Sequence, residues 1–390
     1  MPRRSSKTIR CGLVCNRSYL VDNKIIFSRD YAMPTPLVSI IVTSYNHDAF
    51  LEEALDSVFN QTWKNTEVII VDDASTDRSV EIIKKYQQKY NCKTILRETN
   101  YYSQKDKTGD KPIIEAMNMA TGKYIAVVDS DDLIVPTKIS HQVNVLEKNP
   151  HCVMCYSAIQ VIMPDGSRFP YSDLFLNGDV FHHLLVSGNL SLYIGSLIRR
   201  EAYLKIERSD PELVQEDWDM FLKLSRQGHF ISTQRLVAYY RRHENNTWYR
   251  KDNSKLMYRN RMMILNQWKH EDAWVEAMNS RWKQYAHPDH TLVKEDIDEL
   301  LVKHPTDPLL HFQGFIAAIH TKDVNKAQYH IVQAIIYCDI RLEILPQLYY
   351  AALKSINDNK IRSTILSSLK SRLPDQYQQI SAKFSQDLQQ

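Results

Sequence analysis

The chain has 390 residues, of which 43% are hydrophobic and 24% charged, and its formal net charge is +3. This length and composition predict a globular protein of two or three domains. The small net charge argues against a nucleic-acid partner, and no run approaches the 18 apolar residues of a membrane-spanning helix. We therefore expect a cytoplasmic protein with at most peripheral contact with the inner face of a membrane.

The cysteine and glycine patterns bear on two kinds of site, a zinc site and a glycine-rich phosphate-binding loop. Cys11, Cys15, Cys152 and Cys155 have spacings that a four-thiolate zinc site permits. However, residues 151–156 are typical of a buried strand that would turn Cys152 and Cys155 to opposite faces, which favours reduced thiols. The sequence contains neither Gly-x-Gly-x-x-Gly nor Gly-x4-Gly-Lys. A bound nucleotide would therefore need a metal to hold its phosphates.

The first elements alternate between strand and helix. Residues 1–35 form an N-terminal arm with no assigned role, and an apolar strand over 37–42 follows. It ends in Thr43-Ser44-Tyr45-Asn46, and Asp48 then begins an amphipathic helix. A second strand over 68–71 ends at Asp72-Asp73. Polar residues thus follow both strands where they end.

The pattern then repeats. A helix over 79–90, a strand over 93–97 and a helix from Lys111 to Ala120 lead to the strand Tyr124 to Val128. Four such alternations predict an α/β fold with a mainly parallel sheet. The carboxyl ends of three strands should therefore lie side by side along one rim, which is where open α/β sheets bind ligands.

Carboxylates are concentrated after the fourth of these strands. Asp129, Asp131 and Asp132 fall within four residues. A divalent cation, Mn²⁺ or Mg²⁺, would relieve their mutual repulsion and would also bind substrate phosphates. The alternative is a polar turn in which Asp132 caps the next helix.

Together these segments resemble the family 2 glycosyltransferases of the GT-A fold. The resemblance rests on residues 36–46, the Gln61-Thr62-Trp63 turn, residues 68–77 and residues 120–131. It implies a nucleoside-diphosphate sugar donor and a glycan, lipid-linked or protein acceptor. It also implies roles for single residues: Thr43 and Tyr45 flank the base and ribose, Asp73 accepts from the base, Asp129 and Ser130 lie near the donor, and Asp131 and Asp129 bind the metal.

A later segment, Glu216-Asp217, extends the resemblance. Glu216-Asp217 begins a helix that contains Trp218 and Phe221. It is similar to the family's acceptor-activating motif, which implies that Asp217 is the general base of a single displacement with inversion. A simple acidic helix start is the alternative.

Four basic residues complete the expected site. A strand over 236–240 precedes Arg241-Arg242-His243, which is similar to the family's terminal segment and implies that His243 reaches the metal or the diphosphate. Arg241 and Arg242 are further diphosphate candidates. Lys111 falls near a basic position of the family that faces the diphosphate. The alternative for Lys111 is a solvated lysine at a helix start.

Beyond about residue 253 the pattern becomes helical. Apolar stripes mark helices through 309–319, 327–338, 345–353 and 361–373. We therefore predict an N-terminal arm over 1–35, a glycosyltransferase domain over 36–250 and a helical C-terminal domain over 251–390. Because short helical hairpins cannot bury both faces alone, the last region should pack on the catalytic domain, on a second copy or on a partner.

The predicted activity is a metal-dependent, inverting glycosyltransferase that uses a UDP-sugar, as in bacterial surface polysaccharide or glycoconjugate synthesis. Two alternatives remain at this point. One is a non-catalytic scaffold that binds nucleotide sugars or glycans. The other is a phosphoacceptor domain of the receiver type, in which Asp72, Asp73 and Asp129 form an acidic pocket.

Overall fold

The computed structural model describes most of the chain after residue 34 and two short strands before it. The described residues are 18–21, 24–27, 35–101, 103, 111–214, 216–244, 246, 254–285, 292, 294–339, 341–356 and 359–387. Strands β1 (Ser18–Val21) and β2 (Lys24–Phe27) pair antiparallel. The rest of the predicted N-terminal arm up to Pro34 lies outside the described residues.

The first half of the main sheet is parallel, as expected. Its strands have the spatial order β5-β4-β3-β6, so the predicted rim exists and the carboxyl ends of β4, β3 and β6 are neighbours. The elements of this half are β3 (Val38–Ser44), α1 (Asp48–Phe59), β4 (Thr66–Asp72), α2 (Ser79–Tyr90), β5 (Lys93–Leu96), α3 (Pro112–Met119) and β6 (Tyr124–Asp129).

The second half of the sheet adds short antiparallel pairings to the mainly parallel sheet that was predicted. Strand β10 (Ser196–Arg199) lies between β6 and β8 (Cys152–Ile162) and is antiparallel to both. Strand β11 (His229–Arg241) runs parallel to β8 and pairs antiparallel with β7 (Leu133–Ile134). The short β9 (Arg168–Pro170) pairs antiparallel with β8.

The two cysteines of β8 do not point to opposite faces. The pairing of β8 with β11 slips by one residue between Cys152 and Met154, which leaves Val153 as a bulge. Cys152 and Cys155 consequently pack in the same hydrophobic cluster, while Val153 and Met154 belong to the other one. Both cysteines are buried free thiols. The zinc alternative also needs Cys11 and Cys15, which lie outside the described residues.

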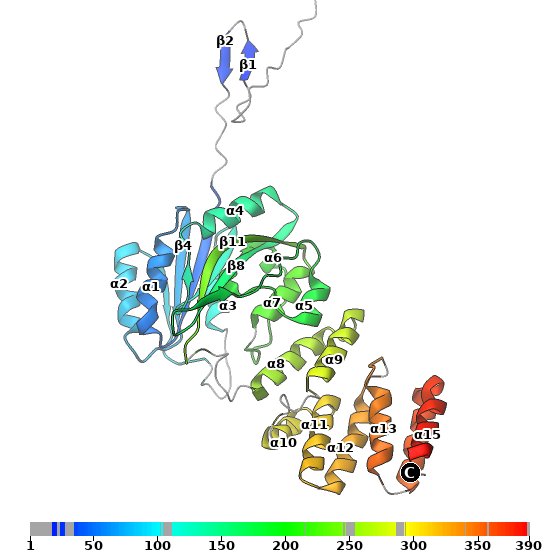
Figure 1. Ribbon diagram of the computed structural model, residues 1–390. Coiled ribbons are helices and arrows are strands. Elements are labelled where there is room, and N and C mark those ends of the chain that lie inside the picture. The colour runs from blue at the N-terminus through cyan, green and yellow to red at the C-terminus, as the bar shows by residue number, and fades with distance from the viewer. Residues whose placement is uncertain are drawn as a thin grey trace, which may run out of the picture.

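Helices cover both faces of the sheet (Figure 1). One hydrophobic cluster joins the sheet to α1, α2 and α4 (Lys138–Lys148). The other joins it to α3, α5 (Phe181–Ser187), α6 (Arg200–Tyr203) and α7 (Glu216–Ser225). This is a three-layer α/β arrangement whose core lies on both sides of the strands.

The C-terminal region is helical, as predicted, and it continues the second cluster. Trp268, the residue that follows its first helix, lies edge-on to Phe181 of α5 with ring centroids 4.9 Å apart. The domain boundary near residue 250 stays a prediction. The helices are α8 (Ser254–Gln267), α9 (Asp272–Tyr285), α10 (Lys294–Lys303), α11 (Pro308–His320), α12 (Val324–Tyr337), α13 (Leu345–Ser355), α14 (Asn359–Arg372) and α15 (Pro374–Asp387).

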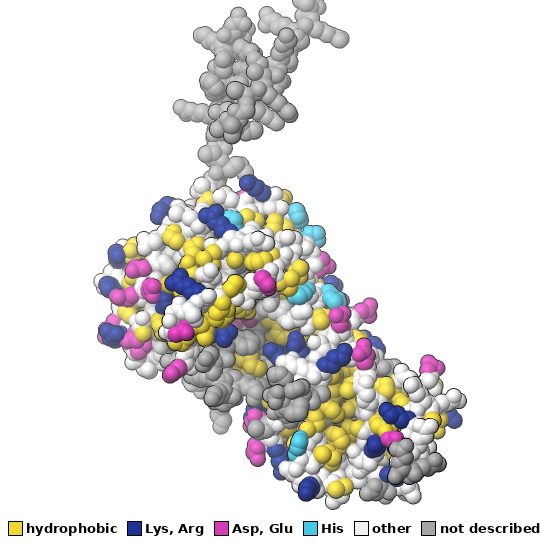
Figure 2. Space-filling view, viewed as in Figure 1, with side chains coloured by type: hydrophobic (Ala, Val, Ile, Leu, Met, Phe, Trp, Pro, Cys, Tyr) yellow, Lys and Arg dark blue, Asp and Glu magenta, His cyan; other side chains and the backbone are white. Residues whose placement is uncertain are grey.

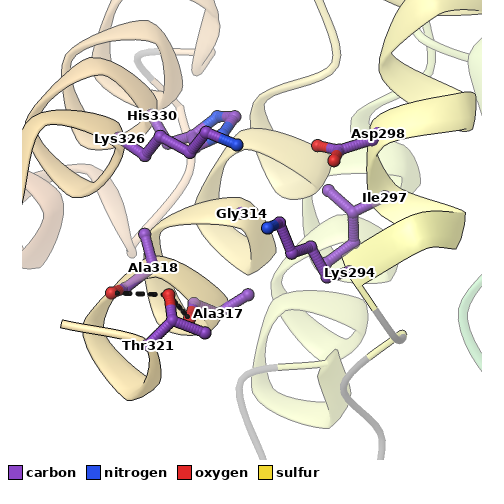
Figure 3. A pocket seen from close by; sticks show the side chains of 9 residues that line it. All are labelled: Lys294, Ile297, Asp298, Gly314, Ala317, Ala318, Thr321, Lys326 and His330. Carbon is purple, nitrogen blue, oxygen red and sulfur yellow. Dashed lines mark hydrogen bonds between the residues drawn. The ribbon is translucent and has the colours of Figure 1, made fainter. Parts of the chain in front are cut away.

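The surface of the C-terminal helices mixes apolar and charged side chains (Figure 2). Val324, Tyr329 and Ile336 of α12 are among the large apolar residues that remain exposed. A small pocket opens between α10, α11 and α12, lined in part by Asp298 and His330 (Figure 3). None of the residues predicted for the site lines this pocket.

Among the described residues, no helix combines the length and the apolar character that crossing a bilayer requires.

Gly122 offers a test of the packing at the amino ends of β3 and β6, the edge of the sheet opposite the rim. A Cβ at this position would lie 2.7 Å from the Ser39 nitrogen and 2.8 Å from the Leu37 carbonyl oxygen, both backbone atoms. We expect Gly122→Ala to lower the free energy of unfolding by about 1–3 kcal/mol, because overpacking displaces a central strand. Denaturant unfolding measures the change. Met119→Ala, at a nearby side chain that is 40% exposed, serves as the control; equal effects of the two variants would contradict this account.

Candidate functional site

The loops that follow β3 and β4 are tied to each other. Asn46 has a positive φ of 52°, and its backbone N–H donates to Ser75 Oγ at 2.8 Å. Its side-chain oxygen accepts from the Thr76 backbone N–H, also at 2.8 Å. Asp72 accepts from the backbone N–H and the hydroxyl of Ser75, at 2.8 and 2.6 Å. These bonds fix the two loops against one another and so shape the rim.

The residues predicted to contact the base and ribose lie in and beside these loops. Thr43 Oγ1 donates to Asp129 Oδ1 at 2.5 Å, and Tyr45 is exposed. Asp73 is 4% exposed and accepts from the Tyr101 backbone N–H at 2.9 Å. Asn100 Nδ2 donates to Asp73 at 2.9 Å, and Arg97 Nε lies 3.3 Å from it. Asp73 therefore anchors the segment after β5, and its contact with a base stays a prediction.

Three side chains converge where a cation could bind. His47, Asp131 and His243 offer ligand atoms that all lie within 4.8 Å of one another. His243 Nε2 is 2.9 Å from Asp131 Oδ2, and His47 Nδ1 is 3.9 Å from Asp131 Oδ1. One carboxylate and two imidazoles are a donor set that divalent metals accept, so these residues fit such an ion.

This group differs in part from the predicted one. Asp131 and His243 are brought together as expected, whereas Asp129 is not part of the group and bonds Thr43 instead. His47 was not predicted. A signal was present, because His47 directly follows the polar segment that ends at Asn46 on the rim.

Neighbouring side chains hold the group in place. Asn246 Nδ2 donates to Asp131 Oδ2 at 3.0 Å, and the His243 backbone N–H donates to Asn246 Oδ1 at 2.6 Å. The ring of Phe50 packs against His243 with centroids 4.7 Å apart. Neighbours such as Asn246 and Phe50 orient metal ligands. Arg241, a diphosphate candidate, instead donates to Glu53 Oε2 at 2.7 Å.

The acidic turn after β6 is electrostatically crowded. Loss of solvation and, next, the charge of Asp131 raise the pKa of Asp129 to about 6, although its side chain stays accessible to solvent. Asp132 is buried and accepts from the Arg241 backbone N–H at 2.8 Å, so it bonds β11 and does not cap α4. Burial, followed by its neighbours Asp131 and Asp129, raises the pKa of Asp132.

Asp217 lies in the first turn of α7, as predicted. Asn189 Nδ2 donates to its Oδ2 at 2.9 Å, and the Trp218 backbone N–H donates to its Oδ1 at 2.8 Å. Its half-buried carboxyl has a pKa raised to about 7, chiefly by desolvation and then by the charge of Glu216; Asp129 contributes too. A carboxyl that titrates near neutral pH is suited to proton transfer.

Lys111 is buried beside this turn. Its Nζ donates to the Leu213 carbonyl oxygen and lies 3.5 Å from Glu216 Oε2. The side chain is 3% exposed, so it is not the solvated lysine of the alternative interpretation. Lys111 neutralises Glu216 in this arrangement, and its predicted contact with a diphosphate stays untested. Ser130 is also buried, and its Oγ lies 2.8 Å from His47 Nδ1.

Comparison with known proteins decides the family. Residues 39–203 match the model described as glycosyl transferase family 2. An uncharacterized glycosyltransferase of Haemophilus influenzae is 31% identical over 191 residues, which cover 49% of this chain and 72% of that protein. The chain belongs to glycosyltransferase family 2. This membership excludes the receiver-type alternative, and it makes the protein a glycosyltransferase.

Other similar proteins agree with this membership. An Escherichia coli protein named UDP-Glc:alpha-D-GlcNAc-diphosphoundecaprenol beta-1,3-glucosyltransferase WfaP is 29% identical over 221 residues, which cover 53% of this chain and 78% of WfaP. Across the relatives, the aligned part is 60 to 78% of the relative's own length and about half of this chain. The family model ends at Tyr203, before Asp217 and His243.

Comparison with solved structures shows a similar fold. Staphylococcal (S. aureus) TarS 1-349, solved in complex with UDP-GlcNAc, has a TM-score of 0.53 and 20% sequence identity. The match covers 86% of this chain and 91% of that one. The sheet domain therefore has the GT-A fold that the sequence predicted, and a helical C-terminal region follows it.

Proposed function

We propose that this family 2 glycosyltransferase moves a sugar from a UDP-sugar to a hydroxyl group of a glycan acceptor, with inversion at the anomeric carbon. A divalent cation, Mn²⁺ or Mg²⁺, takes part. Asp131 and His243 would hold it, and its positive charge would stabilise the diphosphate leaving group. Asp217 is the general base in this proposal.

One observation carries the proposal. The buried carboxylate of Asp131 lies beside His243, and a second, half-buried carboxyl, that of Asp217, has a pKa close to neutral. The charge of Asp131 helps to raise the pKa of Asp129, and the charge of Asp129 helps to raise the pKa of Asp217, so Asp129 lies within electrostatic range of both carboxylates. A phosphate-binding group and a base in one site are the requirements of sugar transfer from a nucleoside diphosphate to a hydroxyl.

Different residues of the chain would bind the donor and transfer the proton. Thr43, Tyr45, Asp73 and Ser130 would position the nucleoside and the phosphates. Asp217 would accept the proton of the acceptor hydroxyl as its oxygen attacks the anomeric carbon, while the nucleoside diphosphate leaves from the opposite side. Asn189 holds one oxygen of Asp217 at 2.9 Å and so orients the carboxyl. No covalent sugar intermediate is needed, which is why the product has inverted configuration.

The names of similar proteins support the choice of substrates. WfaP is named for UDP-Glc and for an acceptor linked to diphosphoundecaprenol, and TarS was solved with UDP-GlcNAc. We accordingly propose a uridine nucleotide and a lipid-linked glycan acceptor. An acceptor of that kind would place the reaction at the cytoplasmic face of a membrane, with peripheral contact, in surface polysaccharide synthesis.

A donor screen tests the proposed function. The full chain is incubated with Mn²⁺ and a panel of UDP-, GDP- and dTDP-sugars, and nucleotide release is measured with and without lipid-linked glycan acceptors. We expect release from one UDP-sugar, stimulated by an acceptor. Release from a GDP- or dTDP-sugar alone would contradict the choice of base, and no release from folded protein would favour the non-catalytic scaffold.

The pH dependence of transfer follows from Asp217. Its pKa of about 7 means that the acid form predominates below neutrality, where it cannot accept a proton. At saturating Mn²⁺ and donor, we expect kcat to fall about tenfold per pH unit below 7 and to level off above it. Donor binding, measured in parallel, separates this effect from lost affinity. A kcat that stays constant from pH 5.5 to 8 would argue against Asp217 as the base.

A further inference from the structure

His47 reaches the rim from the loop between β3 and α1. Its Nδ1 lies 3.9 Å from Asp131 Oδ1, and its ring stands edge-on to that of His243 with centroids 5.5 Å apart. The side chain is 21% exposed, so it sits within the site and not on the open surface. Two bonds of about 2.1 Å to one ion would span this N···O separation.

The start of α1 does not explain the imidazole. His47 occupies the N-cap position, but its side chain makes no capping hydrogen bond. The backbone holds the start of the helix: the His47 carbonyl oxygen accepts from Phe50 and Leu51 at 3.0 Å, and its N–H donates to Ser79 Oγ at 3.3 Å. The imidazole Nδ1 lies 2.8 Å from the Ser130 hydroxyl, and a bound cation would replace that hydroxyl at this nitrogen. A small polar residue would serve the helix equally well, since Asn and Ser are favoured N-caps.

We propose that His47 is a direct ligand of the divalent cation and that it makes the site select Mn²⁺ over Mg²⁺. This inference rests on the proposed function for the cation itself. Mg²⁺ binds oxygen ligands and gives up its waters reluctantly, whereas imidazole suits transition metals. A site with Asp131 as its carboxylate and two imidazoles therefore favours Mn²⁺ more than a site with one imidazole does.

Metal binding to the full chain tests the inference without an activity assay. Mn²⁺ alone is titrated into the wild type and His47→Asn and followed by electron paramagnetic resonance, with Mg²⁺ as competitor. Mutating residues that only orient ligands costs about 10–100-fold in metal affinity, so losing a direct ligand should weaken Mn²⁺ binding at least tenfold. Mg²⁺ affinity should fall less, which lowers the Mn²⁺/Mg²⁺ ratio.

Pulsed electron paramagnetic resonance counts the imidazole ligands of the bound Mn²⁺ directly. We expect two coupled imidazole ¹⁴N nuclei in the wild type and one in His47→Asn. His182→Asn is the matched control. His182 is an exposed histidine of α5 that lies 3.0 Å from Glu276, and its replacement should change neither the Mn²⁺ affinity nor the number of coupled ¹⁴N nuclei. Asn at position 47 keeps a favourable N-cap, so the variant should fold.

The outcomes separate the inference from the proposed function. If Asp131→Ala loses Mn²⁺ while His47→Asn keeps both its affinity and two ¹⁴N couplings, then His47 is not a ligand and only the inference fails. If the folded wild type binds no Mn²⁺, both the inference and the metal dependence of the proposed function fail.

Discussion

Replacing Asp217 with Asn is expected to abolish sugar transfer while donor binding survives. Asn keeps the size of the side chain but cannot accept the proton of the acceptor hydroxyl. General-base catalysis typically contributes 10²- to 10⁴-fold, so kcat should fall by about that factor. Steady-state transfer assays measure the loss, and calorimetry should show unchanged affinity for the UDP-sugar with Mn²⁺.

Stability supplies an internal control for this variant. The folded state raises the pKa of Asp217, so it binds the proton more tightly than the unfolded chain does, and ionisation at pH 8 costs folding stability. Asp217→Asn removes this cost, and its Tm at pH 8 should equal or exceed that of the wild type. Asp375→Asn, an exposed aspartate in the first turn of α15, should change neither kcat nor affinity. Near-normal turnover by Asp217→Asn would show that another group is the base.

Removing Asp131 should have the second large effect. Asp131 is the sole carboxylate of the three-residue group among the described residues, and its Oδ2 is 2.9 Å from His243 and 3.0 Å from Asn246. Asp131→Ala takes away the anionic ligand and the group that orients both neighbours. We expect Mn²⁺-dependent UDP binding to weaken at least 100-fold, as measured by calorimetry.

Two comparisons make the Asp131 result specific. Asp131→Asn keeps the side-chain shape and its hydrogen bonds but loses the charge, and it should be nearly as impaired as Asp131→Ala. UDP binding without a metal should be equally weak in all three proteins. If Asp131→Ala shows the same Mn²⁺ dependence as the wild type, the cation binds elsewhere.

The rim was predictable because its signals are local in the sequence. Each strand is a short apolar run, and each run stops at polar residues such as Thr43 or Asp129, so periodicity alone located the carboxyl ends. The family resemblance then gave those residues roles. The parallel direction of these strands followed from the alternation of strand and helix.

The missed features depend on contacts between distant residues. Strand β10 has only four residues, and its antiparallel place between β6 and β8 is fixed by pairing with strands far along the chain. The partner of Lys111 is Glu216, and that of His47 is Asp131; neither pair is close in sequence. The bulge at Val153, which reverses the expected direction of Cys155, arises from the pairing of β8 with β11.

The central claim is metal-dependent binding of a nucleoside-diphosphate sugar at this rim. The most direct test is a calorimetric titration of the full chain with UDP, GDP and their sugars, each with and without Mn²⁺. We expect tight binding of a uridine nucleotide that requires Mn²⁺. Binding that is equally tight without the metal, or no binding to folded protein, would contradict it.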